Sequence, residues 1–327
     1  MEGGSRNVER PVTPVRVVFF GSPAFAVPSL RAVAAGTTLV AVVSQPDRPA
    51  GRGQAPSPPA VKVAATALGV PVIQPESLRT PEAEAALAAF GADLFVVVAY
   101  GRILPQRLLD LPRLGPWNVH ASLLPRLRGA APIQWSLIRG DSETGVAVMR
   151  MEAGLDTGPV AAMRALPIAD DDTAGSLSDK LAALGAALLG ETLPAIADGR
   201  VTLTPQEHAA ATLAPMLTKA DGHLGFDRPA RVVSAHARGV DPWPGASALL
   251  DGAPLKLFTP RVTDDEVGGV RSQGRPGEVL GLRPEGLTIA CAGGAIAFAE
   301  LQLPGRRRMP AAAVLAGHRI PAGTVLA

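Results

Sequence analysis

The segment VRVVFFGSPAFAVPSLRAVA (residues 15–34) contains a run of β-branched and aromatic residues, a Gly-Ser-Pro turn and an apolar stretch. The run at Val15–Phe20 is typical of a buried strand. Ser22 can cap a helix, and Pro23 suits the first position of one. The segment therefore predicts a strand followed directly by a helix within Ala24–Ala34.

The alternation of strands and helices continues as far as residue 200. Further strands are predicted at Leu39–Ser44, Pro71–Gln74, Leu94–Ala99, Trp117–His120 and Gly145–Met151. Further helices are predicted at Val61–Leu68, Thr80–Ala89, Ala131–Ile138 and Ser176–Leu193, the last closed by Pro194. This pattern favours a doubly wound, Rossmann-like α/β domain with a parallel sheet over residues 15–200. The first turn lacks the G-x-G-x-x-G pattern, which argues against an NAD enzyme.

The pattern changes after residue 200. Residues 201–220 are predicted to form a linker. Residues 221–327 contain short β-type runs separated by turns with Gly or Pro, among them ALLDGAPLKLFTPRV, GLTIACA and AIAFAEL. Regularly spaced short strands favour a small barrel or sandwich. Residues 1–14 lack the apolar core of a signal peptide and are predicted to be a disordered tail.

Composition excludes several classes of protein. The formal net charge is +2 and the sequence pI is near 9.0, which permits a nucleic-acid partner without requiring one. Cys291 is the single cysteine, so no intramolecular disulfide can form, and no metal site is predicted. The longest apolar runs, such as ADLFVVVAY, are too short to cross a bilayer. We therefore expect a cytoplasmic protein without a membrane partner.

Polar side chains gather where one predicted strand ends, in NVHASLLPRLRGAAPIQ (residues 118–134). Asn118 and His120 are two positions apart and project to the same face of a strand. An isolated Asn-x-His is more often a cap and a surface histidine. Here the pair ends a strand of an open α/β sheet, where ligands bind beyond the carboxyl ends. The loop Ser122–Gly129 adds arginine side chains and backbone amides.

Asp156 lies in EAGLDTGPV, between Gly154 and Gly158, and these glycines allow a tight turn that presents the carboxylate. Such an aspartate is commonly only a turn former. Together with Asn118 and His120 it makes a set suited to acyl transfer. The amide and a protonated imidazole can stabilise an oxyanion, and the carboxylate can orient the imidazole or accept a proton. No serine or cysteine nucleophile is required if the attacking group is an amine.

The segment Gln45–Ala60 holds five prolines and two glycines in sixteen residues. We expect it to lack regular structure and to be mobile until a partner orders it. Its positive charges are Arg48 and Arg52, and a guanidinium suits both phosphate and base edges. An exposed arginine without a function is the competing interpretation.

Five motifs carry a resemblance to a known family. They are SQPDRPAGRG (44–53), VVVAYGRILP (96–105), NVHASLLPRLRGAAPIQ (118–134), MEAGLDTG (151–158) and DPWPGA (241–246). In order and spacing they closely resemble the methionyl-tRNA formyltransferase family. The resemblance implies transfer of a formyl group from 10-formyltetrahydrofolate to the α-amine of methionyl-initiator tRNA. It implies no tightly bound cofactor.

The resemblance also implies roles for individual residues and domains. It makes Asn118, His120 and Asp156 catalytic. It places folate contacts at Ser122, Leu123, Leu124, Pro125, Tyr100 and Gly101, and tRNA contacts at Arg52, Arg48 and Lys219. Arg306–Arg308 can also touch phosphate, although a solvated turn explains them about as well. The second domain becomes an OB-like barrel that binds tRNA, and we expect a monomer.

Two other functions remain open from the sequence. A related enzyme can formylate a small amine, such as an amino-sugar nucleotide or a purine precursor ribotide. The purine enzyme resembles only the first domain, and the 44–62 loop argues against the sugar enzymes. A tRNA- or folate-binding protein without catalysis is the third possibility, and the intact Asn118, His120 and Asp156 set argues against it.

Overall fold

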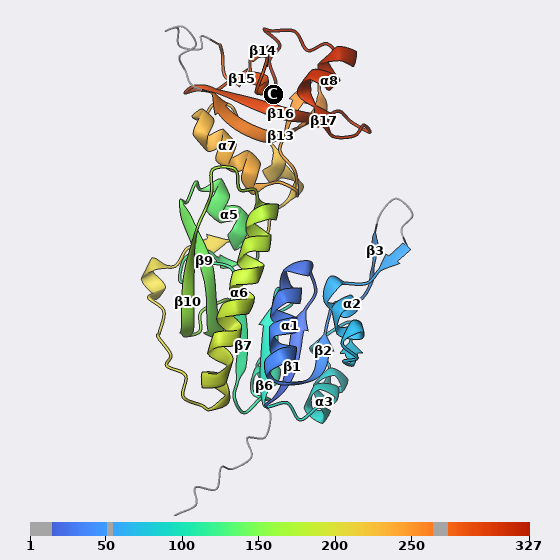
Figure 1. Cartoon of the computed structure of the whole chain (residues 1–327), viewed down its shortest axis with the longest axis vertical. Coiled ribbons are helices and arrows are strands. Elements are labelled where there is room, and N and C mark those ends of the chain that lie inside the picture. The colour runs from blue at the N-terminus through green and yellow to red at the C-terminus, as the bar shows by residue number, and fades with distance from the viewer. Residues whose placement is uncertain (1–14, 51–54, 264–273) are drawn as a thin grey trace, which may run out of the picture.

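The structure is a computed structural model that describes residues 15–50, 55–263 and 274–327. The tail predicted at residues 1–14 and the predicted tRNA contact Arg52 lie outside this part. An α/β domain forms the lower part of Figure 1, and a smaller β domain lies above it. The two domain types agree with the fold predicted from the sequence.

A seven-stranded sheet of order β10-β9-β7-β6-β1-β2-β5 forms the centre of the first domain. Its strands are β1 (Arg16–Gly21), β2 (Thr38–Val43), β5 (Val72–Ile73), β6 (Leu94–Val98), β7 (Pro116–His120), β9 (Glu143–Arg150) and β10 (Val160–Pro167). The five neighbouring strands in the order β7-β6-β1-β2-β5 are parallel. β9 runs antiparallel to β7, and β10, which the sequence analysis missed, runs antiparallel to β9. The sheet is therefore parallel at its centre and mixed at one edge.

Helices cover both faces of this sheet, as a doubly wound fold requires. They are η1 (Ala24–Ala26), α1 (Val27–Gly36), α2 (Ala60–Ala67), α3 (Pro81–Ala89), α4 (Gln106–Leu109), α5 (Pro132–Ile138) and α6 (Ala174–Ala197). On one face, Leu30 of α1 and Leu181 of α6 share a buried cluster with Phe19. On the other face, Leu87 of α3 packs with Phe20. The alternating side chains of β1 thus point into two separate cores.

Three local predictions were wrong. Ser22 does not cap the first helix, whose N-cap position is Pro23, because its hydroxyl accepts instead from the backbone N–H of Gln45. Pro194 does not close α6, which continues to Ala197 because Leu193 and Ile196 are buried against the sheet and offset the hydrogen bond that proline removes. The segment after β2 does have regular structure, because β3 (Arg48–Ala50) pairs antiparallel with β4 (Ala55–Ser57). Prolines are tolerated in this hairpin since an isolated two-stranded ladder leaves one edge of each strand free.

Helix α6 is long and apolar enough to cross a bilayer by length and composition alone. It is instead a core helix of the first domain. Its buried side chains, which include Leu177, Leu181 and Leu188, belong to the cluster that covers the central sheet. The helix thus offers no argument for a membrane-spanning segment.

The second domain is a curled antiparallel sheet of order β12-β13-β16-β15-β14, with β17 paired to β16. Its strands are β12 (Ser247–Leu250), β13 (Ala253–Thr263), β14 (Val279–Arg283), β15 (Gly286–Ala290), β16 (Ala295–Gln302) and β17 (Met309–Pro310). The sheet forms a half-barrel consistent with the OB-like fold that the resemblance implies. Helices α7 (Ala230–Gly239) and α8 (Ala311–Gly317), which were not predicted, pack on its apolar face, where Val233 and Val314 join the core.

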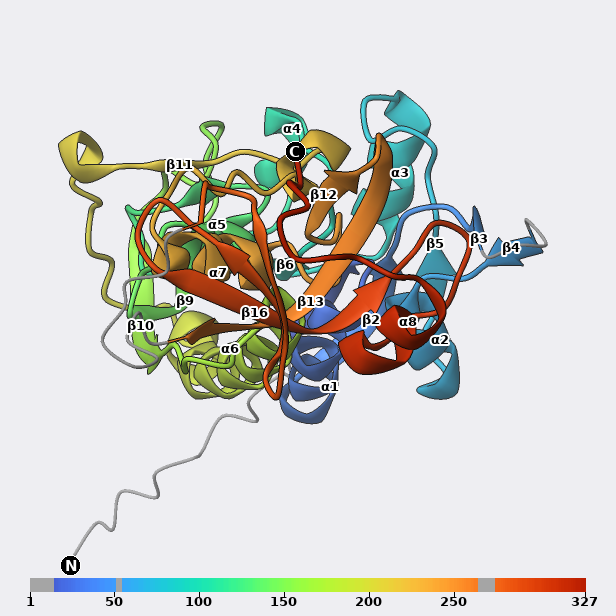
Figure 2. The ribbon, with the colours of Figure 1, turned by 90° about the horizontal axis from the view of Figure 1, so that it is seen from above.

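The two domains pack through α5 and α7. Gly239 of α7 lies so close to α5 that a Cβ there would stand 2.6 Å from the Ile138 side chain. Arg238 donates hydrogen bonds to the backbone carbonyls of Ala169 and Asp172 at the start of α6. Helix α7 therefore binds the second domain to the first (Figures 1 and 2).

Candidate active site

Strand β7 carries two side chains to one carboxylate at its carboxyl end. The Nδ2 of Asn118 donates to Oδ1 of Asp156 over 3.4 Å. The Nδ1 of His120 lies 3.7 Å from Oδ2 of the same carboxylate. The structure therefore brings together the three residues that the sequence analysis named as catalytic, 38 positions apart at most.

Asp156 is held in an unusual backbone conformation. Its φ is +51°, in the left-handed region that residues other than glycine rarely adopt. Its Oδ2 accepts a hydrogen bond from the backbone N–H of Gly129 at 2.9 Å. Its backbone carbonyl accepts from Nε2 of Gln206, also at 2.9 Å. Contacts from two other segments thus fix both the carboxylate and the backbone.

The imidazole of His120 is buried and has a defined hydrogen on one side. Its Nε2 lies 2.9 Å from the backbone carbonyl oxygen of Leu127, and a carbonyl can only accept. Nε2 therefore carries a hydrogen, which leaves Nδ1 on the side of Asp156. Nδ1 lies beside that carboxylate and Asn118, where it accepts a hydrogen bond in the neutral ring and donates one in the charged ring.

The segment between α6 and α7 holds the loop that carries Leu127–Gly129, a role that was not predicted from the sequence. The backbone N–H of Leu127 donates to Oγ1 of Thr212, and that of Arg128 donates to its carbonyl oxygen. The short strands β8 (Arg128–Gly129) and β11 (Leu213–Ala214) then pair in parallel. A lone threonine or glutamine in a polar segment has no spacing that marks it, so the sequence carries no signal for this role.

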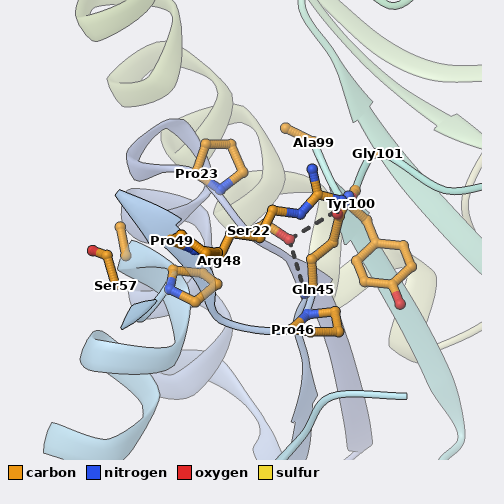
Figure 3. A pocket seen from close by; sticks show the side chains of 12 residues that line it. Ser22, Pro23, Gln45, Pro46, Arg48, Pro49, Ser57, Ala99, Tyr100 and Gly101 are labelled. Carbon is orange, nitrogen blue, oxygen red and sulfur yellow. Dashed lines mark hydrogen bonds between the residues drawn. The ribbon is translucent and has the colours of Figure 1, made fainter. Parts of the chain in front are cut away.

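A cleft of about 410 Å³ opens beyond the carboxyl ends of β1, β2 and β6. Its lining comprises Ser22, Pro23, Gln45, Pro46, Arg48, Pro49, Ser57, Pro59, Ala60, Ala99, Tyr100 and Gly101. The Arg48 guanidinium donates to Oε1 of Gln45 at 2.8 Å, and Nε2 of Gln45 donates to the Tyr100 carbonyl at 2.8 Å (Figure 3). The cleft therefore joins the base of the β3–β4 hairpin to the end of β6.

The predicted folate residues lie in two places. Gly101 and the backbone of Tyr100 line the cleft, while the Tyr100 ring points away from it and packs against Phe20 in the core. Burial raises the pKa of the Tyr100 phenol. Leu124 and Pro125 instead line a smaller cavity of about 210 Å³ beside β10.

The other two predicted folate residues are less accessible. Ser122 is fully buried, and its hydroxyl donates to the Arg126 carbonyl at 2.6 Å. Leu123 is half-buried. One of its methyl groups packs so close to Gly145 that a Cβ on that glycine would stand only 2.5 Å from it. Of the SLLP run, Leu124 and Pro125 thus line a cavity that is distinct from the cleft at Gly101, and Ser122 and Leu123 line neither.

The predicted tRNA contacts are also dispersed. Arg48 lines the cleft, and Lys219 is exposed in the short helix η3 (Lys219–Gly222) at the start of the second domain. Arg308 forms an ion pair with Glu300 and covers the ring of Phe258, with its guanidinium carbon 4.2 Å from the centroid. Arg308 is thus occupied within its own domain. Among the described residues, no three His, Cys, Asp or Glu side chains are grouped to hold a metal ion.

Both domains match known families. The Formyl transferase family matches residues 15–193, and the Formyl transferase C-terminal domain matches residues 216–319. These matches define the chain as a formyl transferase. Methionyl-tRNA formyltransferase of Sorangium cellulosum is 48% identical over 313 residues, which cover 95% of this chain and 99% of that protein. That of Citrifermentans bemidjiense is 46% identical over 316 residues, 96% and 97% of the two chains.

The chain belongs to the methionyl-tRNA formyltransferase family, which uses 10-formyltetrahydrofolate as its co-substrate. More distant structures share the fold. HypX from Aquifex aeolicus in complex with tetrahydrofolic acid has a TM-score of 0.61 at 19% identity, over 93% of this chain and 47% of that chain. The sugar 3N-formyl transferase WlaRD has a TM-score of 0.65 at 16% identity, over 90% and 99%.

Proposed function

We propose that the chain transfers the formyl group of 10-formyltetrahydrofolate to the α-amine of methionyl-initiator tRNA. The observation that carries this proposal is the convergence of Asn118 and His120 on the carboxylate of Asp156. In the proposed division, residues 15–200 form the catalytic domain and residues 221–327 bind tRNA. The mildly basic sequence and the cleft beside the β3–β4 hairpin support such a partner.

The proposed reaction balances without a covalent intermediate on the protein. The methionyl amine nitrogen attacks the formyl carbon, and a new nitrogen–carbon bond forms. The bond from that carbon to N10 of the folate breaks, and one proton leaves the amine while one reaches N10. The products are the formylated aminoacyl-tRNA and tetrahydrofolate.

Each polar residue has a distinct part in this proposal. The Asn118 amide and a protonated Nδ1 of His120 donate to the oxygen that gains negative charge during the attack. Asp156 holds the imidazole in place and accepts the amine proton. The burial of His120 reduces competition from water for these hydrogen bonds.

We favour a tRNA acceptor over a small amine because relatives that are 45–49% identical over about 95% of the chain are all named methionyl-tRNA formyltransferase. The sugar formyltransferase structures share only the fold at 16% identity. A glycinamide ribonucleotide transformylase covers only 63% of this chain. That structure therefore has no counterpart to more than a third of this chain.

A competition among acceptors tests the proposal. The purified full chain is given 10-formyltetrahydrofolate and one of three amines: methionyl-initiator tRNA, a nucleotide-linked amino sugar or glycinamide ribonucleotide. We expect rapid formation of formylmethionyl-tRNA and no formylation of the two small amines. Preferential formylation of a small amine would replace the proposed acceptor. Folate binding without transfer to any of them would favour the non-catalytic alternative.

A further inference from the structure

Gln206 lies directly behind Asp156, in the segment between α6 and α7, and its side chain is only 8% exposed. Its Nε2 donates to the backbone carbonyls of Asp156 at 2.9 Å and of Gly158 at 2.6 Å. Both hydrogens of the amide are thus used on the loop that presents the catalytic carboxylate. Neither bond touches the carboxylate itself.

The other end of the same amide holds a buried arginine. Oε1 of Gln206 accepts from Nε and Nη2 of Arg128, at 3.1 and 2.6 Å, and Arg128 is 6% exposed. Arg128 follows Leu127, whose carbonyl receives the Nε2 hydrogen of His120. It precedes Gly129, whose N–H binds the Asp156 carboxylate. One side chain therefore ties together the two segments that position His120 and Asp156.

The backbone at these positions needs such support. Asp156 at φ +51° and Gly129 at φ +122° both lie outside the conformations that most residues prefer. A non-glycine residue in the left-handed region costs roughly 1–3 kcal/mol and persists only where its surroundings hold it. Gln206 has a fixed base for this purpose, because Thr204 exchanges two backbone hydrogen bonds with Val160, at 2.8 and 2.9 Å.

We propose that Gln206 is a positioning residue for formyl transfer, which acts through Asp156 and does not contact either substrate. This inference rests on the proposed function, since it assigns to Gln206 the alignment of the carboxylate used there. A misplacement of a reacting group by about 1 Å can cost on the order of 100-fold in rate. Loss of the two amide hydrogens should therefore lower kcat and leave substrate binding unchanged.

Two substitutions separate positioning from stability. Gln206→Glu keeps an acceptor for Arg128 but cannot donate to the carbonyls of Asp156 and Gly158. Gln206→Met removes both functions. The buried Arg128 guanidinium then loses the acceptor of its Nε and keeps only Nδ1 of His208, 3.0 Å from Nη2, among the acceptors of these two nitrogens, which destabilises the fold. The matched controls are Gln106→Glu and Gln106→Met, because Gln106 is an exposed glutamine whose amide bonds Asp110 on α4.

Steady-state formylation of methionyl-initiator tRNA and thermal unfolding are measured for all variants. We expect both Gln206 variants to lose roughly 10- to 100-fold in kcat, with unchanged KM for tRNA and for 10-formyltetrahydrofolate. Both variants leave the carbonyls of Asp156 and Gly158 without their donor, and Gln206→Met also removes an acceptor of Arg128. Gln206→Met should therefore lower the unfolding temperature more than Gln206→Glu, while the two losses of kcat should be similar. The Gln106 variants should match the wild type in both measurements.

Two results would overturn the inference. Wild-type kcat in Gln206→Glu would show that the two donated hydrogen bonds are not needed for catalysis. A raised KM with unchanged kcat in either folded variant would place Gln206 in substrate binding. If the wild-type chain itself does not formylate methionyl-initiator tRNA, the proposed function fails first, and the two failures are thereby distinguished.

Discussion

Asp156 receives contacts from four residues on three separate parts of the chain. Asn118 and His120 reach it from β7, the Gly129 amide from β8, and the Gln206 side chain from the segment after α6. At the scale of single residues, the proposed chemistry depends on these contacts, because they hold the Asp156 carboxylate in one position. A carboxylate fixed from several sides loses little free energy to reorganisation when the amine attacks.

The first residue-scale prediction concerns Asn118, whose amide is the proposed neutral donor to the developing oxyanion. Asn118→Ala should lower kcat by roughly 10²–10³, the usual cost of removing one such donor. Equilibrium binding of the folate should change little, because the interaction forms in the transition state. Steady-state kinetics and a folate titration measure the two quantities. A wild-type kcat would show that the amide has only a structural role.

Part of the site was predictable from residue spacing. The two-residue repeat of a strand predicts that Asn118 and His120 project to the same face. In the structure both side chains lie beside the Asp156 carboxylate, as that prediction requires. The glycines around Asp156 indicated a tight turn. Gln206 was not predictable, because its partners are backbone carbonyls 48 and 50 positions earlier in the chain. Backbone partners leave no side-chain pattern in the sequence.

At the scale of elements, the β3–β4 hairpin sets the shape of the cleft. Its base is fixed by polar side chains. Nζ of Lys62 on α2 donates to both carboxylate oxygens of Asp47 and to Oε1 of Gln74. Gln74 in turn donates to the Gln45 carbonyl. The hairpin therefore projects from an anchored base. Its blue strands lie beside α2 and are labelled β3 in Figure 1 and β3 and β4 in Figure 2.

The element-scale prediction concerns the proposed tRNA contact Arg52, which falls between β3 and β4 in the sequence and outside the described residues. Arg52→Ala should raise KM for methionyl-initiator tRNA, or lower kcat/KM for it, because a guanidinium that binds phosphate or a base edge is lost. The KM for 10-formyltetrahydrofolate should stay unchanged, and Lys219→Ala provides a second cationic position for comparison. Unaltered tRNA kinetics in Arg52→Ala would contradict the assignment.

Strands were predictable where both of their faces are buried. The runs VRVVFF and LFVVV became β1 and β6, because side chains on both of their faces are buried. The alternating pattern of β10 was not predicted, because its exposed positions Met163 and Ala165 are apolar and the half-buried position between them is Arg164. Helix α7 was not predicted either. Its residues are mostly polar or small, and it packs against α5, which is far away in the sequence.

At the scale of the whole molecule, the segment just before α6 is a second place, beside the α5–α7 packing, where the two domains are in contact. Asp172, in this segment, has a carboxylate that accepts hydrogen bonds from Lys180, Ser176 and the backbone of Ala169. Arg238 of the second domain binds the carbonyls of Ala169 and Asp172. The Asp172–Lys180 ion pair and the contact of Arg238 with the first domain thus involve the same short segment, residues 169–172.

This connection predicts how stability depends on pH. Burial alone would raise the pKa of Asp172, but the bonds from Lys180, Ser176 and Ala169 outweigh it and lower the pKa below 3.8. The carboxylate therefore stabilises the fold at pH values above 3.8, and this contribution is lost as the pH falls through the lowered value. Asp172→Asn should cost roughly 1.5–3 kcal/mol at neutral pH.

Denaturant unfolding of the wild type and Asp172→Asn over a pH series measures this effect. The difference between the two unfolding free energies should shrink as the pH is lowered below 3.8, because the wild-type carboxyl then becomes neutral as well. Asp198→Asn is the control, since its ion pair with Arg200 is exposed and should contribute little. A difference for Asp172→Asn that is constant with pH would contradict the account.

The most direct measurement of the central claim is a single turnover of the formyl group with Asp156→Asn. Excess wild-type or variant protein, loaded with 10-formyltetrahydrofolate, is mixed with methionyl-initiator tRNA, and formylmethionine is followed in time. The substitution keeps the shape of Asp156 and removes its charge, so we predict a rate at least roughly 100-fold below the wild type, with both substrates still bound. A variant that transfers the formyl group at the wild-type rate would contradict the assignment of catalysis to Asn118, His120 and Asp156.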